Sequence, residues 1–153
     1  MTIRKATPQD RDTLIQIRLD FLEEDKGFLS IEEEQGIRTQ LAGYFESHID
    51  RDFFAVLAEE DGKAVSCVFL VVTERPANTV FLNGKSGTIH NVYTYPQYRK
   101  KGIASALLQE ILKEAKQQDI YSVELIATPA GKPLYEKHGF DGIKNTYMRM
   151  STQ

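Results

Sequence analysis

Residues 94–105 decide the fold, and they read Thr94-Tyr95-Pro96-Gln97-Tyr98-Arg99-Lys100-Lys101-Gly102-Ile103-Ala104-Ser105. Before this stretch, β-branched and aromatic residues from position 88 to 94 predict a strand. After it, apolar residues at helical spacing predict an amphipathic helix; they are Ala104, Leu107, Leu108, Ile111, Leu112 and Ala115. A strand therefore leads through a short basic turn directly into a helix.

This turn has the features of a phosphate site. The first amide groups of a helix have no internal partners and the helix dipole is positive at that end, so several amides can donate to one phosphate. Gly102 removes a side chain where an anion would approach the backbone, and Arg99, Lys100 and Lys101 add positive charge. An ordinary helix start with a solvated basic turn fits the same residues, so they leave both interpretations open.

Two other phosphate motifs are excluded. Gly84-Lys85-Ser86 is similar to the end of a P-loop, but that motif needs a glycine five residues before its final glycine, where this chain has Thr79. The chain contains no G-x-G-x-x-G sequence, which excludes the dinucleotide fingerprint.

The rest of the chain predicts a mixed sheet with helices on both faces. Strands are expected at residues 3–6, 53–59, 64–73, 121–127 and 147–150. Helices are expected from Thr7 to about residue 24, from a Ser30 cap to residue 45, and at residues 134–138. The Asp61-Gly62 pair predicts a hairpin. Because antiparallel hairpins precede a strand–helix–strand unit, we expect a mostly antiparallel α/β fold rather than a parallel Rossmann sheet.

The length and composition predict one globular domain covering residues 1–153. Hydrophobic residues make up 41% and charged residues 27% of the chain, which argues against disorder. The 19 basic and 22 acidic residues give a net charge of −3, which argues against a nucleic-acid partner. Cys67 is the only cysteine, so no intramolecular disulfide can form, which fits a reducing compartment. No stretch of apolar residues is suited to a signal peptide or a membrane span. We therefore expect a cytoplasmic protein with no membrane partner.

Two short motifs resemble those of a known family. The stretch Arg99-Lys100-Lys101-Gly102-Ile103-Ala104 is similar to the Q/R-x-x-G-x-G/A motif of the GNAT superfamily of acyl-CoA-dependent N-acetyltransferases. Further on, Pro133-Leu134-Tyr135-Glu136-Lys137-His138-Gly139-Phe140 resembles the family's L-Y-E-K-x-G-F hallmark. The order of the expected elements is also similar to the family over nearly the whole chain. The resemblance implies a GNAT-like fold and acyl transfer to an amine.

The resemblance also implies a site for acetyl-CoA as co-substrate, with no metal. In the family, amides of the loop and helix start surround the pyrophosphate, and the main chain of the preceding strand pairs with the pantetheine arm. Here these positions are Val92, Thr94, Arg99, Lys100, Lys101, Gly102, Ile103, Ala104 and Ser105. Thr128 aligns with an asparagine that contacts CoA in many members, and its hydroxyl can still donate. The family strand is usually bulged here, which cannot be read from this sequence.

The implied reaction is direct attack of an amine on the acetyl thioester. Tyr135 occupies the position of the family's general acid in this motif. A phenol with a pKa of about 10 stays protonated at neutral pH, so it can donate a proton to the departing thiolate. A backbone N–H near Val92 is expected to polarise the carbonyl. We consider His90 as the base, because strict alternation places it on the same face as Val92 and Thr94. Glu59 acting through water, or no dedicated base, are the alternatives.

The expected acceptor is an amine of an unidentified small molecule or peptide. The first two predicted helices carry many acids, namely Asp20, Glu23, Glu24, Asp25, Glu32, Glu33 and Glu34. We interpret these as solvated helix faces; the alternative is an acidic wall that concentrates a polyamine, an aminoglycoside or another amine. A CoA-binding regulatory module without turnover is the alternative function. The sequence leaves the oligomeric state undecided between a monomer and a homodimer, because no surface patch can be assigned to an interface.

Overall fold

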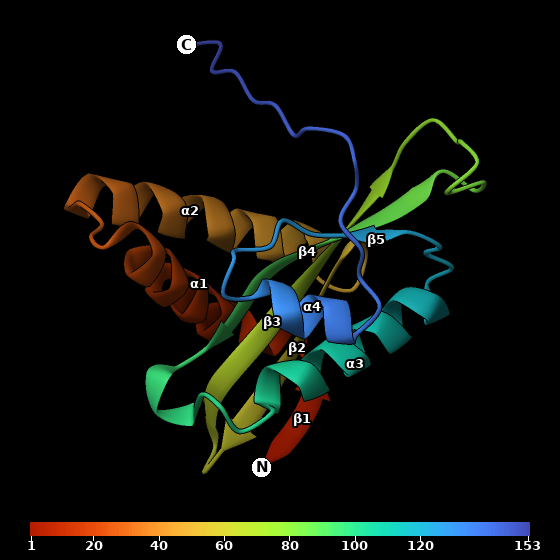
Figure 1. Cartoon of the computed structure of the whole chain (residues 1–153). Helices are drawn as coiled ribbons and strands as arrows, with labels where there is room; N and C mark the ends of the chain where they lie inside the picture. The colour runs from red at the N-terminus through yellow and green to blue at the C-terminus, as the bar shows by residue number, and fades with distance from the viewer.

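The computed structural model describes all of residues 1–153 and contains a five-stranded sheet in the order β1-β2-β3-β4-β5 (Figure 1). The strands are β1 (Thr2–Lys5), β2 (Phe53–Glu60), β3 (Lys63–Glu74), β4 (Lys85–Thr94) and β5 (Val123–Glu124). The first four strands pair antiparallel, and β5 pairs parallel to β4. This arrangement confirms the predicted mixed, mostly antiparallel sheet.

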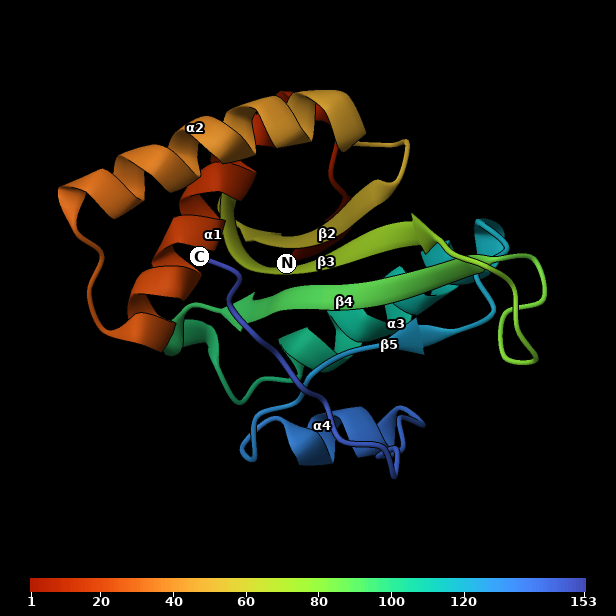
Figure 2. The ribbon, with the colours of Figure 1, turned by 90° about the horizontal axis from the view of Figure 1, so that it is seen from above.

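Helices cover both faces of the sheet. Helices α1 (Arg11–Lys26) and α2 (Ile31–His48) lie on one face and α3 (Ile103–Gln117) lies on the other, as Figure 2 shows from above. The short helix α4 (Lys132–Lys137) follows β5 on the α3 side. Two 3-10 turns, η1 (Pro8–Asp10) and η2 (Pro96–Tyr98), precede α1 and α3. None of these helices combines the length and the apolar character needed to cross a bilayer.

Two apolar layers fill the spaces between the sheet and its helices. Alternate residues of β2 enter different layers: Phe53 and Leu57 pack under α1 and α2, while Phe54 and Val56 pack under α3. Residues 53–58 are all buried. The continuous apolar run of β2 is therefore explained by helices covering both of its faces.

Local signals act as predicted at two junctions. The Ser30 hydroxyl accepts the Glu33 amide at 3.0 Å and the Glu33 carboxylate accepts the Ser30 amide at 3.1 Å, so a capping box starts α2. Asp61 and Gly62 have positive φ angles of 51° and 75°. Both residues therefore adopt the left-handed conformations that a two-residue hairpin turn requires.

Strand β4 carries a bulge that the sequence does not reveal. The pairing of β3 with β4 shifts between Cys67 and Phe69, where Asn91 and Val92 together face a single residue of β3. Asn91 adopts a left-handed φ of 55°, which asparagine tolerates better than most residues. Because one residue is inserted, the alternation of side chains reverses across the bulge.

The C-terminal part of the chain departs from the predicted elements. The strand expected at residues 121–127 is reduced to the two residues of β5, and the Ile126 side chain beyond it is 77% exposed. The strand expected at residues 147–150 is not formed, and this exposed segment leads away from the body of the molecule (Figure 1). That prediction is wrong because a strand needs a neighbour for its backbone groups, and no strand borders this segment.

Candidate active site

A cleft of about 810 Å³ opens beside β4 and is bounded by the turn before α3, the start of α3, α4 and the end of α1. It brings together all but one of the predicted donor-site residues: Val92, Thr94, Arg99, Lys100, Gly102, Ile103, Ala104, Ser105 and Thr128. Lys101 is the exception, and its ammonium group lies 5.6 Å from the ring centroid of Tyr98. Tyr135 from α4 also lines the cleft, whereas His90 does not.

The start of α3 presents backbone donors to this cleft. Gly102 caps the helix with a φ of 77°, and no side chain accepts from the first turn. The first intrahelical donor is the Ala106 amide, which bonds to the Gly102 carbonyl at 3.1 Å, so the amides of residues 103–105 have no intrahelical partner. A Cβ on Gly102 would meet nothing within 4 Å. An anion therefore has both donors and room at this turn.

Strand β4 has an open edge along the same cleft. It pairs with β5 only at Gly87–Val123 and Thr88–Glu124, so the strand from Ile89 onward has no neighbour on that side. The Thr94 hydroxyl is fixed by the Ser66 hydroxyl at 2.8 Å. The exposed main chain next to Val92 and Thr94 is thus available to pair with an extended ligand.

Arg99 is tied to its surroundings rather than free. Its guanidinium donates to both carboxylate oxygens of Glu24 at 2.7 and 2.8 Å, and its Nε donates to the Thr94 carbonyl at 2.7 Å. The hydrogen bond from Arg99 is the main reason that the pKa of Glu24 is lowered. Arg99 therefore joins the turn to α1, and Lys100 keeps a free positive charge at the cleft.

Tyr135 lies on α4 at the wall of the cleft. Its ring makes an edge contact with Phe140 at a centroid distance of 6.1 Å. The position that a Cβ on Gly131 would occupy lies 3.1 Å from the Tyr135 ring. Desolvation by burial raises the pKa of Tyr135, so its hydroxyl is protonated at neutral pH. The Thr128 hydroxyl accepts the Gly131 amide at 3.1 Å and keeps its own proton for a further acceptor.

The face predicted for His90 is wrong. The bulge at Asn91 lies between His90 and Val92, so the two side chains point to opposite faces of the sheet instead of the same face. His90 pairs across to Phe69, which belongs to the layer under α1 and α2, whereas Val92 packs against the α3 layer. Partial desolvation, followed by the positive charge of Arg18, lowers the pKa of His90.

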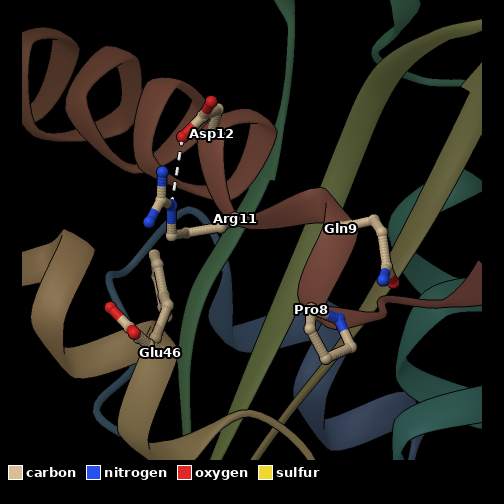
Figure 3. Close-up of a pocket in the computed structure, with 6 residues that line it drawn as sticks. Pro8, Gln9, Arg11, Asp12 and Glu46 are labelled. Atoms are coloured by element: carbon tan, nitrogen blue, oxygen red, sulfur yellow. Dashed lines mark hydrogen bonds and ion pairs between the residues drawn. The ribbon is translucent and has the colours of Figure 1, made fainter.

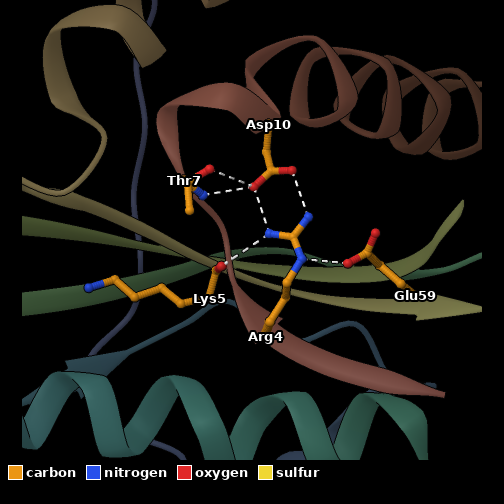
Figure 4. A network of polar contacts seen from close by, with 5 residues as sticks. All are labelled: Arg4, Lys5, Thr7, Asp10 and Glu59. Atoms are coloured by element: carbon orange, nitrogen blue, oxygen red, sulfur yellow. Dashed lines mark hydrogen bonds and ion pairs between the residues drawn. The ribbon is translucent and has the colours of Figure 1, made fainter. Parts of the chain in front are cut away.

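Glu59, the alternative candidate for the base, is bound by Arg4 outside the cleft. Glu59 on β2 accepts the Arg4 Nε at 2.5 Å, and the other side of that guanidinium donates to both Asp10 oxygens at 2.8 Å (Figure 4). Arg4 lowers the pKa of Asp10 mainly through these hydrogen bonds. The network joins β1 to η1 and β2, and Glu59 does not line the cleft.

Cys67 and His138 have structural roles. Burial raises the pKa of the Cys67 thiol to about 12, so this residue is a small buried apolar side chain rather than a nucleophile. His138, at the end of α4, bonds through its Nε2 to the Ser105 hydroxyl at 2.7 Å and thereby links α4 to α3. No group of three His, Cys, Asp or Glu side chains converges as a metal site would.

Several of the acids on α1 and α2 are paired within the protein. Besides Glu24, Asp20 accepts the Tyr95 hydroxyl at 2.5 Å. Glu33 pairs with Lys26 and belongs to the capping box of α2. Fewer of the acidic residues on α1 and α2 therefore remain available to attract a cationic acceptor.

A second hollow of about 300 Å³ lies between η1, the start of α1 and α2 (Figure 3). Arg11 at its rim pairs with Asp12 at 3.2 Å, and Glu46 of α2 lies across from them. It contains none of the predicted site residues.

The match to a known family follows from this geometry. Residues 11–140 match the model of the family described as Acetyltransferase (GNAT) family. The chain therefore belongs to the GNAT family of acetyltransferases, and the resemblance drawn from its two motifs is confirmed.

Individual relatives agree with this assignment. An uncharacterized N-acetyltransferase of Archaeoglobus fulgidus is 28% identical over 127 residues, which cover 82% of this chain and 80% of that protein. The crystal structure of a predicted acetyltransferase with acetyl-CoA from Clostridium acetobutylicum has a TM-score of 0.86 at 28% identity, over 98% of this chain and 95% of that chain. A GCN5-related N-acetyltransferase from Ralstonia eutropha has a TM-score of 0.81 at 24% identity over 97% of each chain, which shows the fold alone.

Reasoning from the residues alone missed two features next to the cleft, although the family resemblance implied the first. The first is the bulge, whose only local signal is an asparagine at position 91, a residue type that tolerates positive φ. The second is Arg18 on α1, which contacts Asn91 across the fold. Nothing in the helical pattern around Arg18 distinguishes it from a solvated arginine.

Proposed function

We propose that this protein is an N-acetyltransferase that transfers an acetyl group from acetyl-CoA to an amine of a small molecule or peptide by direct attack. The observation that carries the proposal is the cleft, which joins the uncapped start of α3, the open edge of β4 and the side chain of Tyr135. Membership of the GNAT family and the acetyl-CoA of the Clostridium structure support this donor.

The turn before α3 would hold the pyrophosphate. The amides of Ile103, Ala104 and Ser105 point out of the helix start, and Lys100 and Lys101 supply positive charge nearby. The main chain at Val92 and Thr94 would pair with the pantetheine arm along the open edge of β4. From the opposite wall, the Thr128 hydroxyl would donate the contact that an asparagine makes in many family members.

Acetyl-CoA supplies an activated acyl group, and the chain must position it and protonate the departing thiolate. A backbone N–H at the bulge near Val92 would donate to the thioester oxygen. Tyr135 would donate its proton to the departing sulfur as the carbon–sulfur bond breaks, because its raised pKa keeps the phenol in the protonated form at neutral pH, and the tyrosinate would then regain a proton from solvent.

His90 remains the candidate base, from a different position than the alternation predicted. Its ring lies on the α1–α2 face, so it would meet an amine that approaches from that side of β4. The lowered pKa keeps the imidazole neutral at neutral pH, which is the form that accepts a proton. The absence of His90 from the cleft is also the observation that favours the second candidate, a CoA-binding regulatory module without turnover.

The first experiment compares the melting temperature with and without acetyl-CoA. A ligand at 100 times its Kd adds about 2.7 kcal/mol to the free energy of unfolding, which raises the melting temperature by roughly 5–10 °C in a domain of this size. We expect this shift with acetyl-CoA and not with ATP or NAD. No shift at millimolar acetyl-CoA contradicts the donor site. A shift with acetyl-CoA, but no release of CoA when any of the amines is added, favours the regulatory module.

A further inference from the structure

Arg18 is a partly buried cation without an acidic partner. It lies on the face of α1 that looks toward β4, and its Nη1 donates to the Asn91 side-chain oxygen at 3.1 Å. None of the ion pairs in the structure includes it. A guanidinium has five N–H donors, so most of its donors are left for another acceptor.

The acids around Arg18 do not neutralise it. Asp20 is held by the Tyr95 hydroxyl, and Glu24 is held by Arg99. Asp25 acts on Arg18 only through a longer-range charge interaction, and desolvation is the main influence on its pKa, which is lowered. A buried charge normally has a partner, because desolvation is costly without one. An anionic group that reached Arg18 would therefore offset part of this desolvation cost.

The position of Arg18 connects this charge to the cleft. Its guanidinium carbon lies 5.7 Å from the ring centroid of Phe21, and Phe21 lines the cleft. Its hydrogen-bond partner Asn91 immediately precedes Val92 in the bulge, where the proposed function places the thioester oxygen. Arg18 lies on α1, and His90 lies opposite Phe69 on the same face of the sheet, so the positive charge of Arg18 acts on His90.

We propose that Arg18 binds a carboxylate of the acceptor, so that the acceptor is an amine that also carries a carboxylate, as a free amino acid does. This inference rests on the proposed function and adds the chemical class of the acceptor. The planar guanidinium can donate two parallel hydrogen bonds to a carboxylate. A phosphate, with a charge of about −1.5 to −2, suits this site less well, because Arg18 is a single cation and the negative charge of Asp25 also acts at this position.

The test uses matched pairs of acceptors with the full-length chain. Each free amino acid of a panel is compared with its own amide, and CoA release is followed with a thiol reagent at a fixed acetyl-CoA concentration. We expect kcat/KM for the preferred amino acid to exceed that for its amide by about tenfold to 100-fold, the range expected for a charge-assisted pair. In Arg18→Gln this ratio falls to near one while turnover of the amide is retained. Arg18→Lys gives an intermediate ratio, because it keeps the charge without the planar fork.

Arg11→Gln is the matched control, since Arg11 is on the same helix but lies at the hollow of Figure 3. This control should keep the full preference for the amino acid. The inference is overturned if no carboxylate in the panel is preferred over its amide by more than twofold, or if Arg18→Gln lowers turnover of both acceptors equally. Failure of the proposed function is seen separately, as a wild-type melting temperature that acetyl-CoA does not raise.

Discussion

The two sides of strand β4 are assembled in different ways. On the α3 side, the start of α3 and the turn before it come from one short stretch, residues 95–105, and they line the cleft together. On the α1 side, the contact between Arg18 and Asn91 joins positions 73 residues apart in sequence. The first arrangement follows from the local chain, whereas the second exists only after α1 packs on the sheet.

The two sides also differ in the charge that they present. The α3 side offers uncapped amides together with Lys100, which suits a polyanion such as a pyrophosphate. The α1 side offers the single unpaired cation Arg18 beside neutral His90. Under the proposed function, the donor binds on the α3 side of β4 and the acceptor approaches from the α1 side.

The largest expected effect comes from breaking the α3 side at Gly102. Gly102→Glu would place a negative side chain in the open space at the helix start, and we expect affinity for acetyl-CoA to fall by at least about 100-fold as two like charges meet. Its melting-temperature shift with acetyl-CoA should disappear. Gly62→Glu is the control, because its φ of 75° matches the 77° of Gly102 and imposes the same backbone strain in a distant hairpin. A normal shift in folded Gly102→Glu contradicts the donor site.

The next effect separates binding from chemistry at Tyr135. Tyr135→Phe keeps the ring contact with Phe140 and removes the proton donor, so we expect kcat to fall about 100-fold with the acetyl-CoA shift unchanged. Because the pKa of Tyr135 is raised, wild-type activity should not decline through ionisation of this group below pH 10. Tyr121→Phe, which alters an exposed tyrosine outside the cleft, should leave kcat unchanged. Equal kcat for Tyr135→Phe and wild type, with chemistry rate-limiting, removes this residue from the mechanism.

A smaller effect tests the α1 side at His90. The pKa of His90 is lowered, so its neutral form is lost only when the pH falls below 6.5. We expect kcat/KM to rise with pH through a pKa below 6.5 and then to level off. His90→Gln should lower the plateau about tenfold and abolish the acidic limb. His48→Gln, which removes a histidine paired with Asp52, should keep both. An unchanged pH profile in His90→Gln favours a reaction without a dedicated base.

The smallest effect concerns the positioning of Tyr135. Gly131 has an ordinary φ of −84°, so an added methyl group causes no backbone strain but would lie 3.1 Å from the tyrosine ring. We expect Gly131→Ala to displace the ring and lower kcat by about threefold to tenfold, with little change in melting temperature. Gly142→Ala is the control, because its methyl group would meet nothing within 4 Å. Identical kcat values for the two variants would show that Tyr135 tolerates this displacement.

The C-terminal part shows where strand prediction from sequence reached its limit. Residues 147–150 have strand-forming composition, yet Tyr147 and Met148 are exposed and no strand pairs with them. β-Propensity describes how well a side chain fits a pleated surface, and it provides no hydrogen-bond partner for the backbone. The start of α2 at Ser30 and the Asp61-Gly62 hairpin were predictable because their signals and partners lie within a few residues of each other.

The basic turn, the helix that follows it and the two motifs that resemble the family can be recognised from the amino-acid sequence alone. These features depend on residues close together in the chain, whose backbone groups meet in only a few ways. Three other features depend on how distant parts of the chain pack together: the bulge at Asn91, the face on which His90 lies and the lack of an acidic partner for Arg18. One inserted residue in the register of β4 reverses every later side chain, and whether a charge finds a partner depends on which distant elements pack beside it.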